Sequence, residues 1–310
     1  MKIAFLSRYQ NTIQRGAEIF VLELSTRLKK NHDVDILVGK DADSFTKILS
    51  GYDVVIPING GMQSLKASMG RLFKKYKLII SGQAGIGRGE IWNLAICQPN
   101  IYVALTEYMA IWAEKWAFIS KVVKIPNGVD LSRFINRGER LDLKLERPII
   151  LSVGALTWYK YHQRVIDAMS YLDKGSLLIV GEGEERKKLE ERGKKKLGDR
   201  FKILNFKHAD MPKVYRSANL FTLASWNREA FGIVYVEAMA CGLGVVAPDD
   251  LSRQEIVGEA GILVKTENPQ QYADAITEAL TKNWKDISRR QAEKFSWDQI
   301  AQKYEKIICG

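Results

Sequence analysis

Short apolar runs alternate with longer segments of helical periodicity along this 310-residue chain. The apolar residues of most runs are consecutive, which is typical of strands in a parallel sheet covered on both faces. Helices are expected between the runs, for example over Ala17–Lys29. The pattern predicts an α/β protein with two doubly wound parallel sheets. Strands are expected near Ile3–Leu6, Val34–Val38, Val54–Ile58, Leu78–Ile80, Ile101–Leu105, Val122–Ile125, Ile149–Val153, Leu177–Val180, Lys202–Leu204, Leu220–Ala224, Gly244–Ala247 and Ile262–Val264.

A polar, highly charged stretch at Asn136–Arg147 divides the chain into two halves. It follows Pro126-Asn127-Gly128, in which the Asn-Gly step signals a tight turn. The chain length suits two domains of about 150 residues each. We therefore expect an N-terminal domain over 1–140 and a C-terminal domain over 147–295.

The net charge of +11 favours an anionic partner, such as nucleotide phosphates, an anionic lipid surface or nucleic acid. Nucleic acid is the weakest of the three, because zinc spacing, an RNA-binding aromatic signature and a basic zipper are all absent from the sequence. Three scattered cysteines indicate a reducing compartment without a disulfide framework. The short apolar N-terminus and the glycines in the longest apolar run favour a soluble, cytoplasmic protein.

The stretch from Arg228 to Gly242 contains the strongest chemical signal. Glu229 lies in a loop after an expected strand, and Glu237 lies eight residues later in an apolar helix. Unpaired N–H groups and the dipole make a helix N-terminus a site for anions. Because side chains tilt toward the helix start, Glu237 leans toward that same end. The arrangement suits a ligand that carries both phosphate and hydroxyl groups.

This stretch resembles the Glu-x7-Glu signature of family-four retaining glycosyltransferases, which have the GT-B fold. Phe-Gly follows the first Glu, and Glu-Ala-Met-Ala-Cys-Gly begins at the second. The alternative is an ordinary apolar helix that contains a glutamate. The string Ile125–Asp130 also resembles the one that closes the N-terminal domain in this family. The resemblance implies two Rossmann-like domains facing across a cleft, with the acceptor bound by 1–140, the nucleotide sugar bound by 147–295, and helix 296–310 packing back on the N-terminal domain.

The resemblance also implies a role for each site residue. Glu229 holds the donor sugar and stabilises the developing oxocarbenium charge, a kind of stabilisation worth on the order of 100-fold or more in rate. Glu237 binds the ribose hydroxyls, and Lys160 neutralises the diphosphate. The remaining donor contacts come from the backbone amides around Phe231, Gly232 and Ile233.

Gly16 opens a Gly-Ala-Glu element that in the family faces the donor phosphates; the alternative is an ordinary strand-to-helix turn. The preceding position is usually a second glycine and is Arg15 here, which either reaches a phosphate or is solvated. Relatives have an Arg directly after Gly154, where this chain has Ala155, and Arg15, Arg164 or Arg228 could replace that charge. Many relatives place a His near the donor sugar where this chain has Gln83.

Two further segments have open interpretations. Gly181-Glu182-Gly183 superficially resembles a dinucleotide fingerprint, but Arg186 replaces the third glycine, so the segment is weak evidence for such a site. An NAD-dependent oxidoreductase is an alternative that follows only from the α/β pattern, and Gly-x-Gly-x-x-Gly is lacking after the first expected strand. The segment Gly60–Tyr76 predicts a basic amphipathic helix, and residues 62–77 then contact either an anionic membrane or the domain's own sheet.

The residues and the resemblance together predict a retaining glycosyltransferase. It would move a hexosyl-type sugar from a nucleotide diphosphate sugar to a glycan or lipid-linked acceptor. No cofactor is expected, and no metal, because the fold that the resemblance implies does not require one. The expected location is the cytoplasm, including the inner membrane face. The alternative is a GT-B protein that binds nucleotide sugar with little or no turnover.

Overall fold

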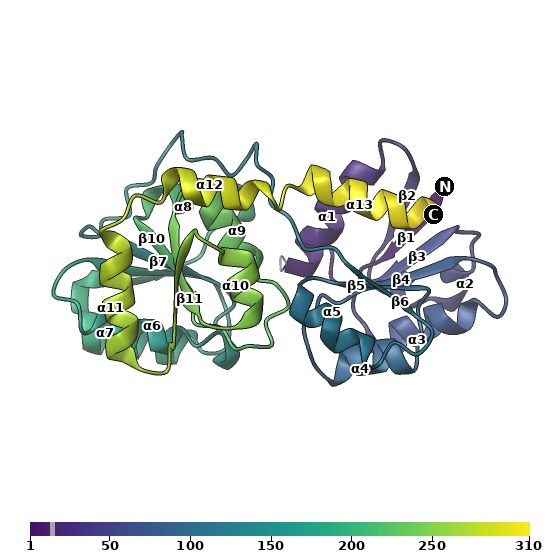
Figure 1. The fold of residues 1–310 in the computed structure, drawn as a ribbon, viewed down its shortest axis with the longest axis horizontal. Helices are drawn as coiled ribbons and strands as arrows, with labels where there is room; N and C mark the ends of the chain where they lie inside the picture. Colours follow the sequence, from purple (N-terminus) through teal and green to yellow (C-terminus); the bar gives the residue numbers. More distant parts are fainter. Residues whose placement is uncertain (13–15) are drawn as a thin grey trace. The chain divides into compact units, whose positions relative to one another are not determined.

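The protein consists of two compact α/β units. A computed structural model describes residues 1–12 and 16–310. The first unit comprises Met1–Gly128, Arg228–Gly232 and Trp297–Gly310; the second comprises Val129–Asn227 and Ile233–Ser296. In the described part of the chain, each unit has a six-stranded parallel sheet with helices on both faces (Figure 1). The predicted doubly wound α/β architecture is confirmed, although residues 129–140 group with the second unit rather than the first.

The first sheet has the strand order β2-β1-β3-β4-β5-β6. The chain runs from β1 to β2 in one direction and then continues on the other side of β1, so β1 and β3 flank a topological switch point. Its strands are β1 (Lys2–Leu6), β2 (Asp33–Leu37), β3 (Val54–Pro57), β4 (Lys77–Ser81), β5 (Ile101–Ala104) and β6 (Lys121–Lys124). Its helices are α1 (Gly16–Leu28), α2 (Phe45–Ile48), α3 (Gly61–Gly70), α4 (Arg88–Ala95), α5 (Glu107–Glu114) and α13 (Trp297–Cys309), with a short 3₁₀ turn η1 (Asp41–Asp43).

Helices from opposite ends of the chain complete the core of the first unit. Figure 1 shows α1 and α13 on one face of the sheet and α3, α4 and α5 on the other. Phe20 on α1 packs against Trp297 and Tyr304 on α13, with ring centroids 6.1 and 5.6 Å apart. Trp297 and Tyr304 are buried in the same apolar cluster as the strands of the first sheet, so α13 is part of this core.

The second sheet has the strand order β12-β11-β10-β7-β8-β9. This is the Rossmann order, with the switch point between β7 and β10. Its strands are β7 (Ile149–Val153), β8 (Ser176–Val180), β9 (Phe201–Leu204), β10 (Leu220–Thr222), β11 (Gly244–Pro248) and β12 (Gly261–Val264). Its helices are α6 (His162–Met169), α7 (Arg186–Leu197), α8 (Met211–Ser217), α9 (Ile233–Ala240), α10 (Leu251–Val257), α11 (Pro269–Leu280) and α12 (Lys285–Glu293), with 3₁₀ turns η2 (Trp158–Lys160), η3 (Gly198–Arg200) and η4 (His208–Asp210).

The predicted helix over Gly60–Tyr76 is too long, since α3 ends at Gly70. The chain then turns back, and the Tyr76 hydroxyl donates a hydrogen bond to the carbonyl of Ala67. A Cβ at position 70 would lie 2.3 Å from the Tyr76 Oη, so only glycine leaves room for this return. The apolar residues Leu72 and Phe73 therefore lie in a surface turn, where they are 81% and 66% exposed.

Candidate functional site

Two neighbouring strands of the second unit lead to the residues predicted to bind the donor. β10 runs parallel to β7, with Leu220 beside Ile150 and Phe221 beside Leu151. Lys160 lies in the segment after β7, and Glu229 and Glu237 come after β10. Ligands of open parallel sheets bind beyond the carboxyl ends of the strands at the switch point. The topology therefore brings the start of both predicted segments to the edge of the sheet where such ligands bind.

The loop after β7 is held by the loop after β8. The amide of Leu156 donates to the carbonyl of Glu182 at 2.8 Å. A Cβ at Gly181 would lie 1.9 Å from the carbonyl oxygen of Gly154, and one at Gly183 would lie 2.4 Å from that of Leu156. These glycines therefore serve close backbone packing, which explains the Gly-x-Gly pattern without a dinucleotide.

His162 lies at the start of α6, close to the loop that contains Lys160. It is completely buried, and its Nδ1 lies 3.1 Å from the Ser152 hydroxyl. Burial, together with the nearby Lys160 charge, lowers the pKa of His162 to about 4. The imidazole is therefore neutral at pH 7, and the charge near this turn belongs to Lys160.

Aromatic side chains join the segments that follow β7 and β10. The amide of Trp226 donates to the carbonyl of Tyr159 at 3.0 Å. The two rings lie 5.2 Å apart between centroids, and Trp158 packs edge-on against Trp226 at 5.3 Å. Arg253, which is fully buried, donates to the Ser225 hydroxyl and the Trp226 carbonyl. These contacts hold the beginning of the second segment against the first.

Glu237 is buried on α9, with 4% of its surface exposed. The Tyr215 hydroxyl donates to its Oε2 at 2.7 Å, and the His208 Nε2 lies 3.3 Å from its Oε1. Burial, followed by the Glu237 charge, raises the pKa of Tyr215 well above its usual value, so this hydroxyl remains a donor. The carboxylate of Glu237 is thus fixed by two side chains, and each oxygen keeps a second lone-pair direction for a ligand.

The neighbours of His208 determine its tautomer. The guanidinium of Arg133 lies 3.2 Å from the His208 Nδ1 and can only donate there. His208 Nδ1 therefore accepts, and Nε2 carries the proton that it donates to Glu237. Sequence reasoning missed Arg133, His208 and Tyr215, because they come from η4, α8 and the start of the second unit and share no local motif with Glu237.

The helix that follows the predicted phosphate site begins as expected. α9 starts at Ile233, directly after Gly232, whose φ of 80° is accessible to glycine. The side chains of Phe231 and Ile233 are 2% and 7% exposed, so only their backbone could face a ligand. Glu229 is half-buried and groups with the first unit, whereas Glu237 groups with the second.

The remaining predicted residues of the first unit lie after β1 and β4. Gly16 is exposed and is the first residue of α1, while Arg15 lies outside the described residues. Gln83 forms a reciprocal amide pair with Asn127, with N–O distances of 3.0 and 2.9 Å. Its nitrogen also donates to the Ser81 hydroxyl at 2.9 Å. Gln83 is thereby held in one orientation within its own unit.

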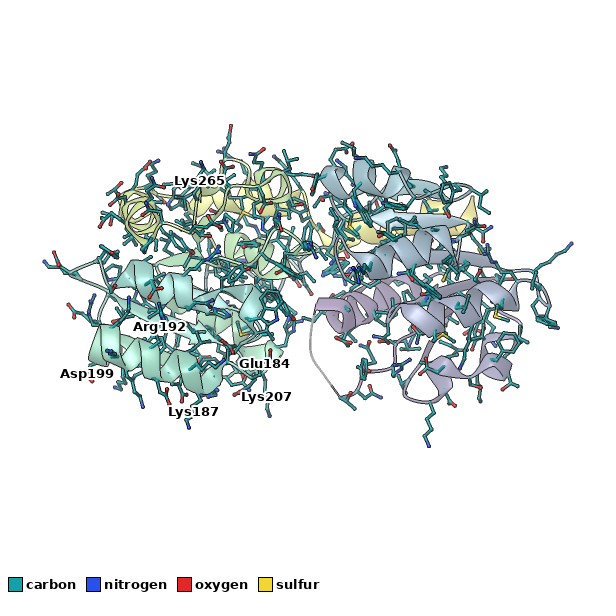
Figure 2. The ribbon with its side chains drawn as sticks, turned by 90° about the horizontal axis from the view of Figure 1, so that it is seen from below. Glu184, Lys187, Arg192, Asp199, Lys207 and Lys265 are labelled. Carbon is teal, nitrogen blue, oxygen red and sulfur yellow. The ribbon has the colours of Figure 1, made fainter. Side chains whose placement is uncertain are left out.

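The cations of the second unit are partly engaged with acidic side chains. Arg164 donates to Glu267 at 2.8 Å and stacks on the Tyr161 ring, with its Cζ 4.0 Å from the centroid. Arg192 on α7 pairs with Asp167. Figure 2 shows Lys187 on the outer surface of the second unit, and its side chain is exposed. The basic run on α7 is thus a solvated, ion-paired helix face.

Residues 1–12 and 16–310 lack both a metal-binding cluster and a membrane-spanning helix. They contain no group of three or more His, Cys, Asp or Glu side chains arranged to hold a metal ion. No helix in these ranges is both long and apolar enough to cross a membrane. Metal independence remains a prediction.

Comparison with known proteins identifies the family. The profile of the family Glycosyl transferases group 1 matches residues 136–296. A phosphatidyl-myo-inositol mannosyltransferase from Mycobacterium tuberculosis is 32% identical over 328 aligned positions, covering 90% of this chain and 86% of that protein. An uncharacterized glycosyltransferase from Methanocaldococcus jannaschii is 32% identical over 205 positions, covering 58% of this chain and 52% of that one.

Solved structures share the fold over the whole chain. HepE from Anabaena, in complex with UDP-glucose, superposes with a TM-score of 0.83 at 19% identity, covering 100% of this chain and 99% of that one. Sucrose-phosphate synthase from Thermosynechococcus elongatus gives a TM-score of 0.84 at 19% identity, with 99% and 98% coverage. With its two parallel-sheet units and its family match, this chain belongs to the group 1 glycosyltransferases and has the GT-B fold.

Proposed function

We propose that this protein is a retaining glycosyltransferase that moves a hexosyl-type sugar from a nucleotide diphosphate sugar to a glycan or lipid-linked acceptor. The second unit binds the donor, and the first unit takes the acceptor. The transfer needs no metal or cofactor. The relatives that carry the name phosphatidyl-myo-inositol mannosyltransferase support a lipid-linked acceptor.

The observation that carries the proposal is the anchored carboxylate of Glu237. Tyr215 and His208 each donate to one of its oxygens, which leaves the carboxylate oriented to accept from the two hydroxyls of a ribose. Lys160, in the segment after β7, supplies a positive charge for the diphosphate. Glu229 stabilises the charge that develops on the transferred sugar.

Donor binding is tested by calorimetric titration with UDP, GDP, ADP, dTDP and CDP, with NAD as the negative control. We expect one nucleoside diphosphate to bind, and NAD to give no signal. Glu237→Ala should weaken this binding at least tenfold, because the ribose hydroxyls lose their acceptor. Lys303→Ala, an exposed substitution on α13, should leave the affinity unchanged. Equal affinity in Glu237→Ala and the wild type would refute the assignment.

Sugar transfer is tested separately from binding. With the matching nucleotide sugar, Glu229→Gln should keep nucleotide affinity and lose turnover on the order of 100-fold. The anomeric configuration of the product, read by NMR, decides retention. The alternative function, binding without turnover, follows from Ala155, which stands where relatives have a cation. It predicts nucleotide binding without any release of sugar from the bound donor.

An exposed apolar surface on the first unit supports membrane contact by residues 62–77. Met62, Met69, Leu72 and Phe73 are 61%, 48%, 81% and 66% exposed. Lys74 and Lys75 lie beside them and are exposed as well. Lys66, Arg71 and Lys77 are different, because they donate to backbone carbonyls of their own unit. The membrane contact therefore rests on the turn Leu72–Lys75 rather than on the whole predicted helix.

Vesicle sedimentation tests the membrane contact. Phe73→Ser should reduce binding to vesicles with 30% phosphatidylglycerol several-fold, because it removes an exposed apolar anchor beside two cations. Leu22→Ser on α1, where the leucine is 52% exposed, is the matched control and should bind as the wild type does. Equal losses in both variants would show that the turn has no special role.

A further inference from the structure

Gly85 brings two segments of the first unit into close backbone contact. It lies in the loop of residues 82–87, which follows β4, and its φ is 78°. A Cβ at this position would lie 2.1 Å from the carbonyl oxygen of Arg228 and 3.1 Å from the amide nitrogen of Ala230. Glu229 stands between these two residues, and both segments belong to the first unit. Because Gly85 has no side chain, the loop can lie against the backbone that carries Glu229.

A side chain at Gly85 would point at protein rather than into open space. Glycines also occur where a ligand approaches the backbone closely, and there a Cβ has room until the ligand binds. A Cβ at Gly87 of the same loop has such room, since it meets no atom of the described residues within 4 Å. At Gly85 the nearest atoms belong to the backbone and cannot rotate away as the end of a flexible side chain can. Gly85 therefore serves the contact with residues 228–230.

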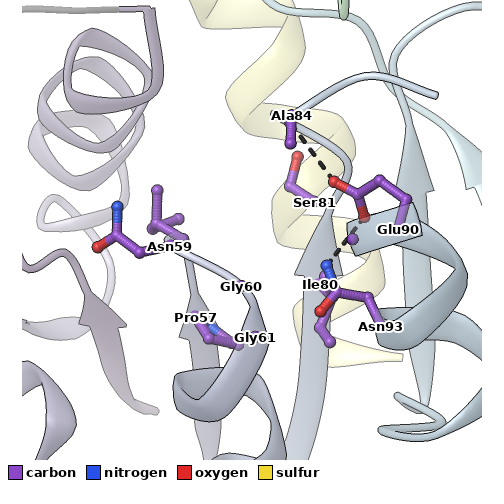
Figure 3. Close-up of a pocket in the computed structure, with 11 residues that line it drawn as sticks. Pro57, Asn59, Gly60, Gly61, Ile80, Ser81, Ala84, Glu90 and Asn93 are labelled. Atoms are coloured by element: carbon purple, nitrogen blue, oxygen red, sulfur yellow. Dashed lines mark hydrogen bonds between the residues drawn. The ribbon is translucent and has the colours of Figure 1, made fainter. Parts of the chain in front are cut away.

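Backbone hydrogen bonds tie the loop of residues 82–87 to its own unit. The Gly82 amide donates to the carbonyl of Val103 on β5 at 2.9 Å. The Ala84 amide donates to the Oε1 of Glu90 at 3.4 Å. Figure 3 shows this second bond, which joins the loop to the first turn of α4. The position of the loop is thus determined by the sheet and by the helix that follows it.

Neighbouring side chains leave the loop little room to withdraw. A Cβ at Gly82 would lie 2.5 Å from the Oη of Tyr102, so the loop already packs tightly on the inside. The amide pair of Gln83 and Asn127 holds the next residue in place. The loop is therefore the rigid side of the contact, and an atom added to it would displace the segment that carries Glu229.

The displacement would be large on the scale that matters for a reaction. Ordinary contacts of a Cβ begin at about 3.4 Å, so the carbonyl oxygen of Arg228 would have to retreat to that distance from 2.1 Å. Glu229 follows Arg228 directly and would move with it. A misplacement of about 1 Å can lower a reaction rate about 100-fold.

We propose that Gly85 is a positioning residue for Glu229. The loop of residues 82–87 is the seat of residues 228–230 and determines where the Glu229 carboxylate lies. Gly85 has no side chain with which to touch a substrate, so it acts only through Glu229. The inference rests on the proposed function, in which Glu229 stabilises the charge that develops on the transferred sugar.

Three alanine variants separate this contact from backbone strain. Gly85→Ala adds both a clash with residues 228–230 and the strain of a side chain at positive φ. Gly51→Ala adds only the strain, because Gly51 has a φ of 87° and its Cβ would meet no described atom within 4 Å. Gly87→Ala adds neither, since its φ of 174° is extended backbone. If Gly85→Ala is too unstable to purify, Gly85→Asn takes its place, because asparagine tolerates positive φ.

Turnover and nucleotide affinity give the first readout. With the matching nucleotide sugar, the kcat of Gly85→Ala should fall at least tenfold, while its affinity for the nucleoside diphosphate stays within about twofold of the wild type. Gly51→Ala and Gly87→Ala should keep the wild-type kcat. In a Glu229→Gln background, Gly85→Ala should cause no further loss, because the carboxylate through which it acts is already gone. A wild-type kcat in Gly85→Ala, or an equal loss in both backgrounds, would overturn the proposal.

Hydrogen exchange read by mass spectrometry separates this proposal from the proposed function. The amides of residues 228–232 should exchange faster in Gly85→Ala than in the wild type, Gly51→Ala and Gly87→Ala. If the wild type transfers no sugar from any donor, the proposed function fails, and this difference in exchange still supports the seat. If the wild type transfers sugar but neither kcat nor exchange changes in Gly85→Ala, the proposed function stands and the seat is refuted.

Discussion

The hydrogen bond from Tyr215 to Glu237 is a test of how much a single buried hydroxyl contributes. Tyr215→Phe keeps the ring and removes one of the donors to a buried carboxylate. The free energy of unfolding of the second unit should fall by about 1–3 kcal/mol, because a buried charged acceptor loses one of its two side-chain donors. Urea denaturation measures this change. Tyr171→Phe, where the tyrosine is 54% exposed, should change stability little; similar values for both variants would contradict the assignment.

His162 predicts a pH dependence of stability. Its pKa of about 4 in the folded state lies below the usual value of 6.5. Between these values the unfolded chain binds the extra proton, so the free energy of unfolding falls as the pH decreases from about 6.5 to about 4. At about 1.4 kcal/mol for each pKa unit, the loss is about 3 kcal/mol. Urea titrations at several pH values should show that His162→Gln loses less free energy of unfolding over this pH range than the wild type does. An equal loss in both proteins would mean that other groups cause the decrease in stability at low pH.

At the level of single residues, the sequence predicted positions better than partners. The apolar pattern around Glu237 placed it on a helix after a strand, and the structure has it there. Nothing in the sequence pointed to His208, because its contact with Glu237 joins residues 29 positions apart.

Helix α13 is the element whose loss should damage the first unit most. Tyr304 is fully buried and packs on Phe20 of α1. Tyr304→Ala should lower the free energy of unfolding of the first unit by about 3–5 kcal/mol, because it leaves a cavity where a large aromatic ring was packed. Differential scanning calorimetry measures the effect. Lys303→Ala on the same helix is the control, and its transitions should match those of the wild type; a comparable loss there would mean that α13 tolerates no change.

Among the elements, strands were predictable and the ends of helices were not. Most strands are runs of buried apolar residues, and every expected strand is present within two residues at each end. The helix after β3 was predicted too long, because Met69, Leu72 and Phe73 continue the apolar spacing but are exposed. Spacing alone does not distinguish an apolar residue that faces the core from one that faces outward.

At the scale of the molecule, separate cores predict separate unfolding. One apolar cluster contains Ile150 and Leu220, and the other contains Phe5 and Trp297. Calorimetry should resolve two transitions. A nucleoside diphosphate at about 100 times its dissociation constant should raise only the transition of the second unit, by the equivalent of about 2.7 kcal/mol. Tyr304→Ala should lower only the transition of the first unit and so identifies it. A single transition that shifts as a whole with the nucleotide and with Tyr304→Ala would contradict independent unfolding of the two units.

The discontinuous make-up of the first unit has a consequence for its biosynthesis. Domains of a nascent chain usually fold in the order in which they leave the ribosome. Here the core around Phe20 lacks Trp297 and Tyr304 until the whole second unit has been translated. At about 5–20 residues per second, the delay is on the order of ten seconds. The unit that is translated first therefore completes its core last. Until then its exposed apolar surface is the kind of surface that chaperones bind.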